Sequence, residues 1–300
     1  MKIDAHVHIY ETINGYGGRG ELRPIGDGYA RWANGDTVQL IPEGMGDTGF
    51  RTETLIRLLD QNHISKAIVL QGNLYGFQNE YILESIQKYP DRLYGACAVD
   101  PFALHAAELL QRLLEKGYVA AKFECSDNCG LMSFHPRFAL DGERMEIMYE
   151  IIESAGAALV LDIGSRGMNS YQPEAVARIA QKHPRLRIII CHLMAHKKNE
   201  QNYLTEELQL LRMPNIWFDI SAVPWNIMPA PYPFKEALQY IKEAKKILGS
   251  EKLIWGSDAP GVAIYDSYDK LYSYLDGELT DEEEERIFWK NAADAYCLQL

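Results

Sequence analysis

Two features that mark membrane proteins and nucleic-acid-binding proteins are missing from this sequence of 300 residues. It has no apolar run near the ~18 residues that a membrane-spanning helix requires. It also has no excess of basic residues, because 42 Asp and Glu outnumber 30 Lys and Arg to give a formal net charge of −12. An acidic surface repels phosphates and anionic lipids, so we expect no nucleic-acid partner and no membrane partner.

Cysteine is also scarce. The five cysteines are an odd number and are scattered along the chain, which excludes a disulfide framework and favours reduced thiols. Cys125 and Cys129 have a spacing that some zinc sites use, but no second pair accompanies them. No charged segment followed by an apolar stretch stands at the start of the chain, so we expect a cytoplasmic location.

The fold class follows from short apolar runs that alternate with longer segments of helical period. Each run has four to eight residues, is rich in Ile, Val and Leu, and is bounded by turn residues, which is typical of buried parallel strands. The eight runs are Lys2–His8, Lys66–Gln71, Leu93–Val99, Val119–Glu124, Ala158–Asp162, Leu186–His192, Ile216–Ile220 and Lys252–Ser257.

Amphipathic segments between these runs predict crossover helices. They are Glu53–Gln61, Glu80–Lys88, Ala103–Lys116, Glu143–Ser154, Pro173–His183 and Phe234–Leu248. No glycine-rich dinucleotide-binding loop follows the first run. Eight alternations in a chain of this length favour a single α/β domain, residues 1–300, folded as a closed (β/α)8 TIM barrel. Residues 10–51 interrupt the alternation of strands and helices, and we expect them to form a long, lid-like loop after the first strand.

Candidate site residues stand at the ends of the predicted strands. His6 and His8 alternate along one strand, so both side chains point to the same face, as a pair of metal ligands would. The other strand-end residues are ionisable as well, and these are Lys122, Glu124, Asp162, His192 and Asp258. So many ionisable groups beside apolar strands require pairing or a metal ion. They also fall at the carboxyl ends of the strands, where active sites of such barrels lie.

Four segments carrying these residues resemble the amidohydrolase superfamily, in particular the branch that holds ACMSD-like decarboxylases and several lactonases. The segments are Asp4-Ala5-His6-Val7-His8, Ile190-Cys191-His192-Leu193, Ile254-Trp255-Gly256-Ser257-Asp258-Ala259-Pro260 and Asn291-Ala292-Ala293. The resemblance implies that His6, His8 and Asp258 bind one divalent metal ion, usually zinc. It also implies that His192 assists the chemistry and that Asp258 takes a proton from a metal-activated water.

The sequence departs from the family at Asp162, where the family usually has a histidine ligand. Asp162 is either a ligand of zinc or of a harder ion such as manganese, or a partner of Arg166 or Lys122. Glu124 is a further candidate ligand, and a metal-free site, as in metal-independent lactonases, stays open. Some superfamily members carboxylate a lysine at the Lys122 position, but we expect Lys122 to pair with Glu124, Asp162 or substrate.

The leading hypothesis is therefore a metal-assisted hydrolase of a small, carboxylate-bearing lactone, amide or related cyclic substrate. The alternatives are an ACMSD-like metal-dependent decarboxylase, a metal-independent lactonase and a catalytically silent barrel that binds a ligand. Arginine suits a carboxylate because its planar fork engages both oxygens. The candidate substrate-binding residues are Arg19, Arg23, Arg51, Asn73, Tyr75, Lys122, Arg166, His196 and Trp225. The aromatic residues Trp32, Trp225 and Tyr232 would suit a contact between subunits of a homo-oligomer.

Overall fold

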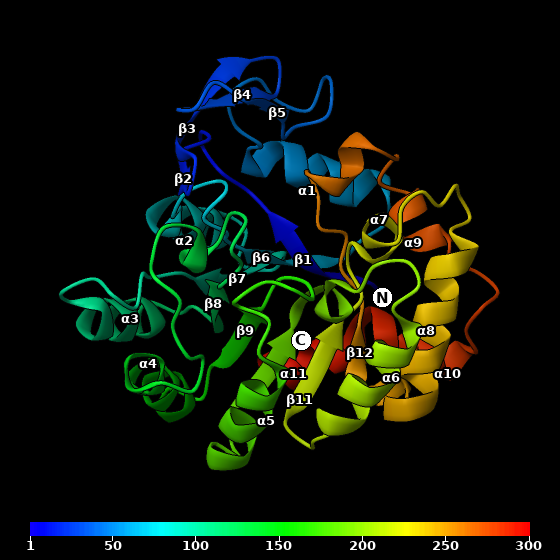
Figure 1. The fold of residues 1–300 in the computed structure, drawn as a ribbon. Coiled ribbons are helices and arrows are strands. Elements are labelled where there is room, and N and C mark those ends of the chain that lie inside the picture. The colour runs from blue at the N-terminus through cyan, green and yellow to red at the C-terminus, as the bar shows by residue number, and fades with distance from the viewer.

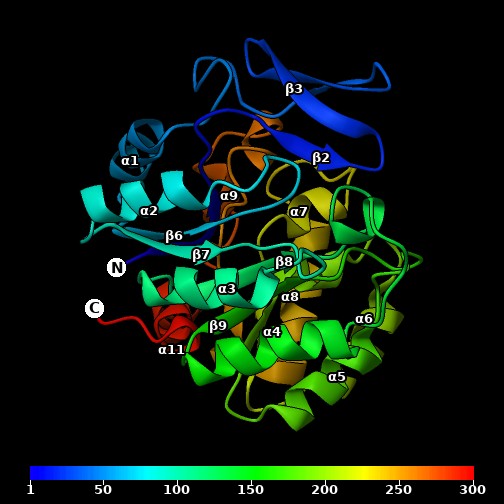
Figure 2. The ribbon, with the colours of Figure 1, turned by 90° about the vertical axis from the view of Figure 1, so that its left-hand side faces the viewer.

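Eight parallel strands form the centre of the computed structural model, which describes residues 1–300. Each strand pairs with the next along the chain, in the order β1-β6-β7-β8-β9-β10-β11-β12. Their bounds are β1 Ile3–His8, β6 Lys66–Leu70, β7 Leu93–Cys97, β8 Ala120–Glu124, β9 Ala158–Asp162, β10 Arg187–Ile190, β11 Ile216–Asp219 and β12 Leu253–Ile254. The predicted (β/α)8 barrel is confirmed (Figures 1 and 2).

The barrel closes between β1 and the segment that follows β12. The amide of Ala5 donates to the carbonyl of Trp255 at 3.2 Å, and the amide of His8 donates to that of Ala259 at 2.8 Å. The amide of Asp258 donates to the carbonyl of His6 at 2.7 Å. The strand expected over Lys252–Ser257 therefore has only two residues in regular ladder geometry, while the rest continues as an irregular closing segment.

Helices surround the barrel because the longer ones each bury one apolar stripe against the strands. In α1, for example, Leu55, Leu58 and Leu59 are buried. The helices are α1 Thr52–Gln61, α2 Asn79–Lys88, α3 Ala106–Glu115, α4 Glu143–Ser154, α5 Pro173–Lys182, α6 Gln201–Leu210, α7 Val223–Asn226, α8 Lys235–Leu248, α9 Lys270–Ser273, α10 Asp281–Glu285 and α11 Asn291–Tyr296. None of them combines the length and the apolar character that a membrane-crossing helix needs.

Residues 10–51 are not the open loop that the sequence predicts. They hold a four-stranded antiparallel sheet in the order β2-β3-β4-β5, which we call the cap sheet: β2 Gly15–Gly17, β3 Gly20–Gly26, β4 Tyr29–Trp32 and β5 Thr37–Gln39. In both ribbon views the cap sheet stands at one end of the barrel (Figures 1 and 2). Leu22, Ala30 and Trp32 form its buried face. The Gly26-Asp27-Gly28 turn has positive φ at all three residues, which glycine tolerates best.

The barrel interior changes character along the strands. Its lower part is a cluster of small and branched apolar side chains that includes Ala120, Ala158 and Val160. Side chains two residues apart share a face, so this same inward face carries Lys122 on β8 and Asp162 on β9 nearer the strand ends. The barrel architecture therefore gathers the ionisable residues at one mouth.

Candidate functional site

His6 and His8 lie side by side at the mouth, as the alternation predicts, with ring centroids 5.1 Å apart. The pairing of β1 with β6 shifts register between Asp4 and Val7, an irregularity common beside active sites. The Nδ1 of His8 lies 3.0 Å from the carbonyl oxygen of Leu70, an obligate acceptor, so Nδ1 carries the hydrogen. The Nε2 of His8 then carries no hydrogen and has a free lone pair. It lies 3.0 Å from Oδ1 of Asp258.

Asp219, at the end of β11, orients His6 in the same way. Its Oδ2 lies 2.8 Å from Nδ1 of His6, which leaves Nε2 of His6 as an acceptor. Burial alone would raise the pKa of Asp219, but its contacts with His6 and His192 hold that pKa well below its usual range. Burial, reinforced by Lys122, lowers the pKa of His6 to about 4, so this ring is neutral at neutral pH. The sequence contained a signal for Asp219, because it is the one acidic residue in an otherwise apolar strand run.

Asp258 follows β12 in a left-handed backbone conformation with φ 57°. A buried network holds this segment: Asp4 accepts hydrogen bonds from the amide and hydroxyl of Ser257 at 2.8 and 2.6 Å, and from the hydroxyl of Tyr268 at 2.6 Å. Burial would raise the pKa of Asp258, but the imidazoles of His192, His8 and His6 hold it well below its usual range. Asp258 is therefore an ionised carboxylate facing two imidazole nitrogens.

His192 also has a left-handed backbone. It begins a run of four residues with positive φ, His192 to Ala195, with φ of 57, 50, 62 and 47°. For this reason β10 ends at Ile190 and not at His192, where the apolar run predicts its end. Residues held in this region cost about 1–2 kcal/mol each and are typical of functional sites. Burial would lower the pKa of His192, but Asp258 and Asp219 raise it, which favours its protonated form.

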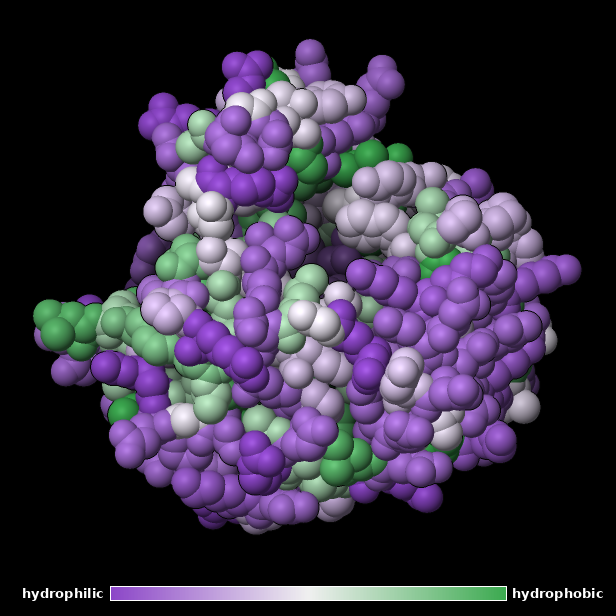
Figure 3. All heavy atoms as spheres, viewed as in Figure 1, coloured by the Kyte–Doolittle hydropathy of each residue, from purple (hydrophilic) through white to green (hydrophobic).

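A cavity of about 300 Å³ lies under the cap sheet. His6 and Asp219 are fully buried and do not belong to its lining. Asp258, His192 and His8 line it together with three predicted substrate-binding residues, Lys122, Tyr75 and Trp225. Arg19, in the turn between β2 and β3, lines it from the cap side, with its guanidinium 4.4 Å from the centre of the Trp32 ring. The space-filling view shows a hollow beside the cap (Figure 3).

Other predicted substrate-binding residues lie elsewhere. Arg23 is on an exposed edge of the cap sheet, and Arg51 precedes α1 at the surface. Neither lines the cavity, because β3 directs Arg23 to the solvent face and Arg51 begins a peripheral helix. Asn73 is buried beside the cavity, where its amide N–H donates to Glu124 at 2.8 Å. Trp32 is 1% exposed, so it is not available as the subunit contact that we expected of it, whereas Trp225 and Tyr232 are exposed.

Arg166 and His196 both contact the carboxylate of Glu207, which the sequence analysis did not identify as a site residue. Glu207, on α6, contacts the guanidinium of Arg166 and the hydroxyl of Tyr171, and its Oε2 lies 2.9 Å from Nε2 of His196. Of the alternatives given for Asp162, the pairing with Arg166 is therefore wrong. The Oδ1 of Asp162 accepts the backbone amide of Gly164 at 2.9 Å, and its Oδ2 lies 3.8 Å from Nε2 of His192.

Glu124 and Asp162 both line the cavity, together with His8 and Asp258 of the three proposed metal ligands. The Oε2 of Glu124 accepts the amide of Asn73 at 2.8 Å, and burial together with the charge of Asp162 raises the pKa of Glu124 to about 7. Neither residue belongs to the tight donor group, in which one atom each of His6, His8 and Asp258 lies within 4.8 Å of the others. That group of two imidazole nitrogens and one carboxylate oxygen fits zinc, and the hydrogen bonds to Asp219 and Leu70 fix both imidazoles in the ligating tautomer.

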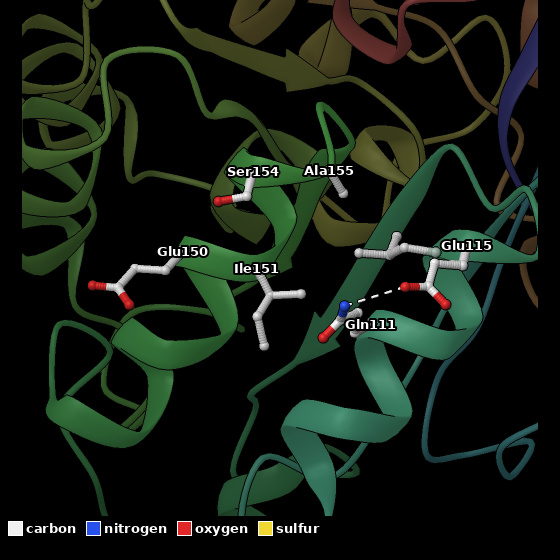
Figure 4. A pocket seen from close by; sticks show the side chains of 7 residues that line it. Gln111, Glu115, Glu150, Ile151, Ser154 and Ala155 are labelled. Carbon is white, nitrogen blue, oxygen red and sulfur yellow. Dashed lines mark hydrogen bonds between the residues drawn. The ribbon is translucent and has the colours of Figure 1, made fainter.

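A larger hollow, of about 600 Å³, lies on the outside of the barrel between α3 and α4 (Figure 4). Its lining includes Gln111, Glu115, Glu150 and Ser154, with a hydrogen bond of 3.2 Å from Gln111 to Glu115. It contains no histidine, cysteine or basic residue. The smaller cavity at the barrel mouth is therefore the candidate active site.

Comparison with known proteins agrees with the fold. A family model described as Amidohydrolase matches residues 3–298. A probable 2-pyrone-4,6-dicarboxylic acid hydrolase of Acinetobacter baumannii, with citric acid bound, has TM-score 0.71 and 19% identity over 99% of each chain. An amidohydrolase of Burkholderia multivorans with bound zinc has TM-score 0.74 and 16% identity over 100% of each chain. The 5-carboxyvanillate decarboxylase of Sphingomonas paucimobilis has TM-score 0.59 and 14% identity over 81% of this chain and 82% of its own. No curated protein is significantly similar in sequence.

Proposed function

Since this chain belongs to the amidohydrolase family, we propose that it hydrolyses a small, carboxylate-bearing lactone, amide or related cyclic substrate. One observation carries the proposal: an ionised carboxylate, Asp258, and an imidazole with a raised pKa, His192, line the same cavity. The cavity volume of about 300 Å³ suits a small molecule. Hydrolysis of a cyclic ester or amide needs both a proton acceptor for water and a proton donor for the departing atom.

The two groups divide these tasks by charge. Asp258 is ionised, so a water in the cavity can donate a hydrogen bond to it and then pass its proton to it. His192 donates Nδ1–H to the carbonyl oxygen of Ser221 at 3.2 Å, which turns Nε2 toward the cavity. Because its acidic neighbours favour the protonated ring, His192 can give a proton at Nε2 to the ring oxygen or nitrogen that leaves.

Cationic and aromatic side chains in the lining support the choice of substrate. Lys122 and Arg19 contribute positive charge to the cavity and suit a carboxylate. Trp225 stacks on Tyr265 at 5.0 Å between ring centroids, and both residues line the cavity, where they suit a flat ring. The size and lining of the cavity therefore support a small molecule as the partner of this protein.

The metal ion proposed for this site is zinc, held by His6, His8 and Asp258. When bound, it would lower the pKa of water and polarise a carbonyl group of the substrate. Replacing both histidines, His6→Ala with His8→Ala, should abolish zinc binding and turnover. Cooperative unfolding should remain, because the apolar layers below the mouth carry the packing.

Decarboxylation is the second candidate reaction. The fold likeness to 5-carboxyvanillate decarboxylase favours it, since the same barrel supports that reaction in the other protein. A panel of cyclic lactones, cyclic amides and carboxylated aromatic acids separates the two reactions by mass spectrometry of the products. Gain of one water supports hydrolysis, whereas loss of carbon dioxide contradicts it. Asp258→Asn serves as the control, because contaminating activity would survive that substitution.

A further inference from the structure

Lys122 is a buried ammonium group without a carboxylate partner. Its residue is 4% exposed, and no carboxylate oxygen lies within 4.0 Å of Nζ. Its one hydrogen bond runs to Nε2 of His6, at 3.3 Å. Burial would lower the pKa of Lys122, but the charges of Asp162, Glu124 and Asp258 at longer range raise it and so favour the charged form. A buried ammonium that no carboxylate contacts directly is nevertheless rare, so its position calls for a functional explanation.

The nitrogen that Lys122 contacts is the nitrogen that a metal ion needs. Because Nδ1 of His6 donates to Asp219, Nε2 has one lone pair and carries no hydrogen. That lone pair can accept an N–H of Lys122 or bind a metal ion, but it cannot do both. The same Nε2 lies 3.6 Å from Oδ1 of Asp258, so a cation at this place is also close to the carboxylate.

We propose that the Lys122 ammonium and a divalent metal ion compete for Nε2 of His6, so that Lys122 sets how tightly the site holds a metal. Either cation places positive charge at the same end of the cavity. The competition follows from two effects: the hydrogen bond must break before the metal binds, and the ammonium then repels a doubly charged neighbour. The inference uses the site of the proposed function, but it concerns metal affinity and not the reaction.

The competition makes an unusual prediction for mutagenesis. Removing a polar residue beside a metal site normally weakens metal binding, because such residues orient the metal ligands. Here Lys122→Met should tighten zinc binding by about 100-fold, since it removes one charge next to a dication in a buried site. Methionine also fills a similar volume without leaving a buried charge.

Zinc affinity is measured on the full chain after chelator treatment, by competition with a zinc-sensitive dye in buffer free of bicarbonate. The variants are Lys122→Met, Lys122→Gln as a second neutral replacement, and Lys122→Arg, which keeps the charge. Lys235→Met is the matched control, because Lys235 is exposed on α8 and away from the cavity. We expect tighter binding for both neutral variants, unchanged or weaker binding for Lys122→Arg, and wild-type affinity for Lys235→Met. Circular dichroism and urea unfolding establish which variants are folded, and either neutral variant suffices.

Equal or weaker zinc binding by a folded neutral variant would overturn the proposal. A second arm repeats the titration of wild type with added bicarbonate. If bicarbonate tightens zinc binding and Lys122→Met abolishes that effect, then Lys122 is carboxylated and acts as a ligand, and the competition does not exist. Because no substrate is present, these results are independent of whether the protein is a hydrolase or a decarboxylase.

Discussion

Acidification of the metal-free protein should reveal that His6 is held neutral in the folded state. Its Nδ1 hydrogen donates to Asp219 at 2.8 Å, and its Nε2 accepts from Lys122 at 3.3 Å. A second proton would take the Nε2 lone pair and would face an ammonium group. Burial, with Lys122, accordingly lowers the pKa of His6 from 6.5 to about 4.

The direction and size of the effect follow from proton linkage. As the pH falls through 6.5 the unfolded chain takes up a proton at His6, while the folded protein does so only near pH 4. The contribution of His6 to stability is thus fully present above pH 6.5 and is lost as the pH falls toward about 4. At about 1.36 kcal/mol per pKa unit, the loss is about 3 kcal/mol.

Two buried carboxyl groups change the stability in the opposite direction as the pH falls. The pH dependence of wild-type stability alone therefore does not test the state of His6. Burial raises the pKa of Asp4 to about 6, and burial with the charge of Asp162 raises that of Glu124 to about 7. A carboxyl whose pKa is higher in the folded state gains stability as the pH falls. Their effects cancel when the free energies of unfolding of wild type and His6→Gln are compared at each pH.

Urea unfolding between about pH 7 and pH 4, with a chelator present, measures that difference. We expect the stability of wild type relative to His6→Gln to decrease by about 3 kcal/mol over this range. His105→Gln is the matched control, since the His105 side chain is 73% exposed, and it should follow wild type. A difference between wild type and His6→Gln that stays constant with pH would refute the assignment of a neutral, proton-resisting His6.

Three further predictions concern acidic residues. Asp258→Asn keeps the side-chain size but removes its basicity, so kcat should fall by about 10²- to 10⁴-fold with a smaller change in KM, and wild-type kcat would exclude Asp258 as the base. Asp162→Asn should retain zinc after dialysis, because Asp162 lies outside the donor group and its carboxylate contacts Gly164 and His192, and loss of zinc would make it a ligand. Glu207→Gln should lower the free energy of unfolding by about 3 kcal/mol because it leaves the buried His196 and the half-buried Arg166 without their carboxylate. The exposed neighbour provides the control, and equal urea midpoints for Glu207→Gln and Glu206→Gln would contradict this account.

The barrel was predictable because its signal is local. Each parallel strand is buried on both faces and therefore appears as a continuous apolar run, so the eight runs agree with the strands to within a few residues. The orientation of His6 and His8 followed from alternation along one strand. The ends of β10 and β12 were less accurate, because left-handed residues such as His192 and Asp258 stop the ladder while the apolar run continues.

The cap sheet and the ion pairs were not predictable in this way. Strands such as β3 are short and mostly exposed, so they lack both the apolar run and a clear alternation. Arg166 pairs with Glu207, which lies 41 positions away in the sequence. The positions of charged residues in a sequence do not show which of them pair in the fold. The arginines were therefore the least accurate part of the candidate site.

The cap sheet enters and leaves the barrel at one place. The amide of Tyr10 donates to the carbonyl of Phe50 at 3.0 Å, and the amide of Ile13 donates to that of Thr48 at 2.8 Å. The insertion is thus closed at its base by backbone hydrogen bonds between its two ends. Within such a family, the residues that react and the residues that select molecules at the entrance can therefore change independently. A lineage can exchange the residues between 14 and 47 and so change which molecules reach Asp258, while the strand ends that hold this carboxylate stay as they are.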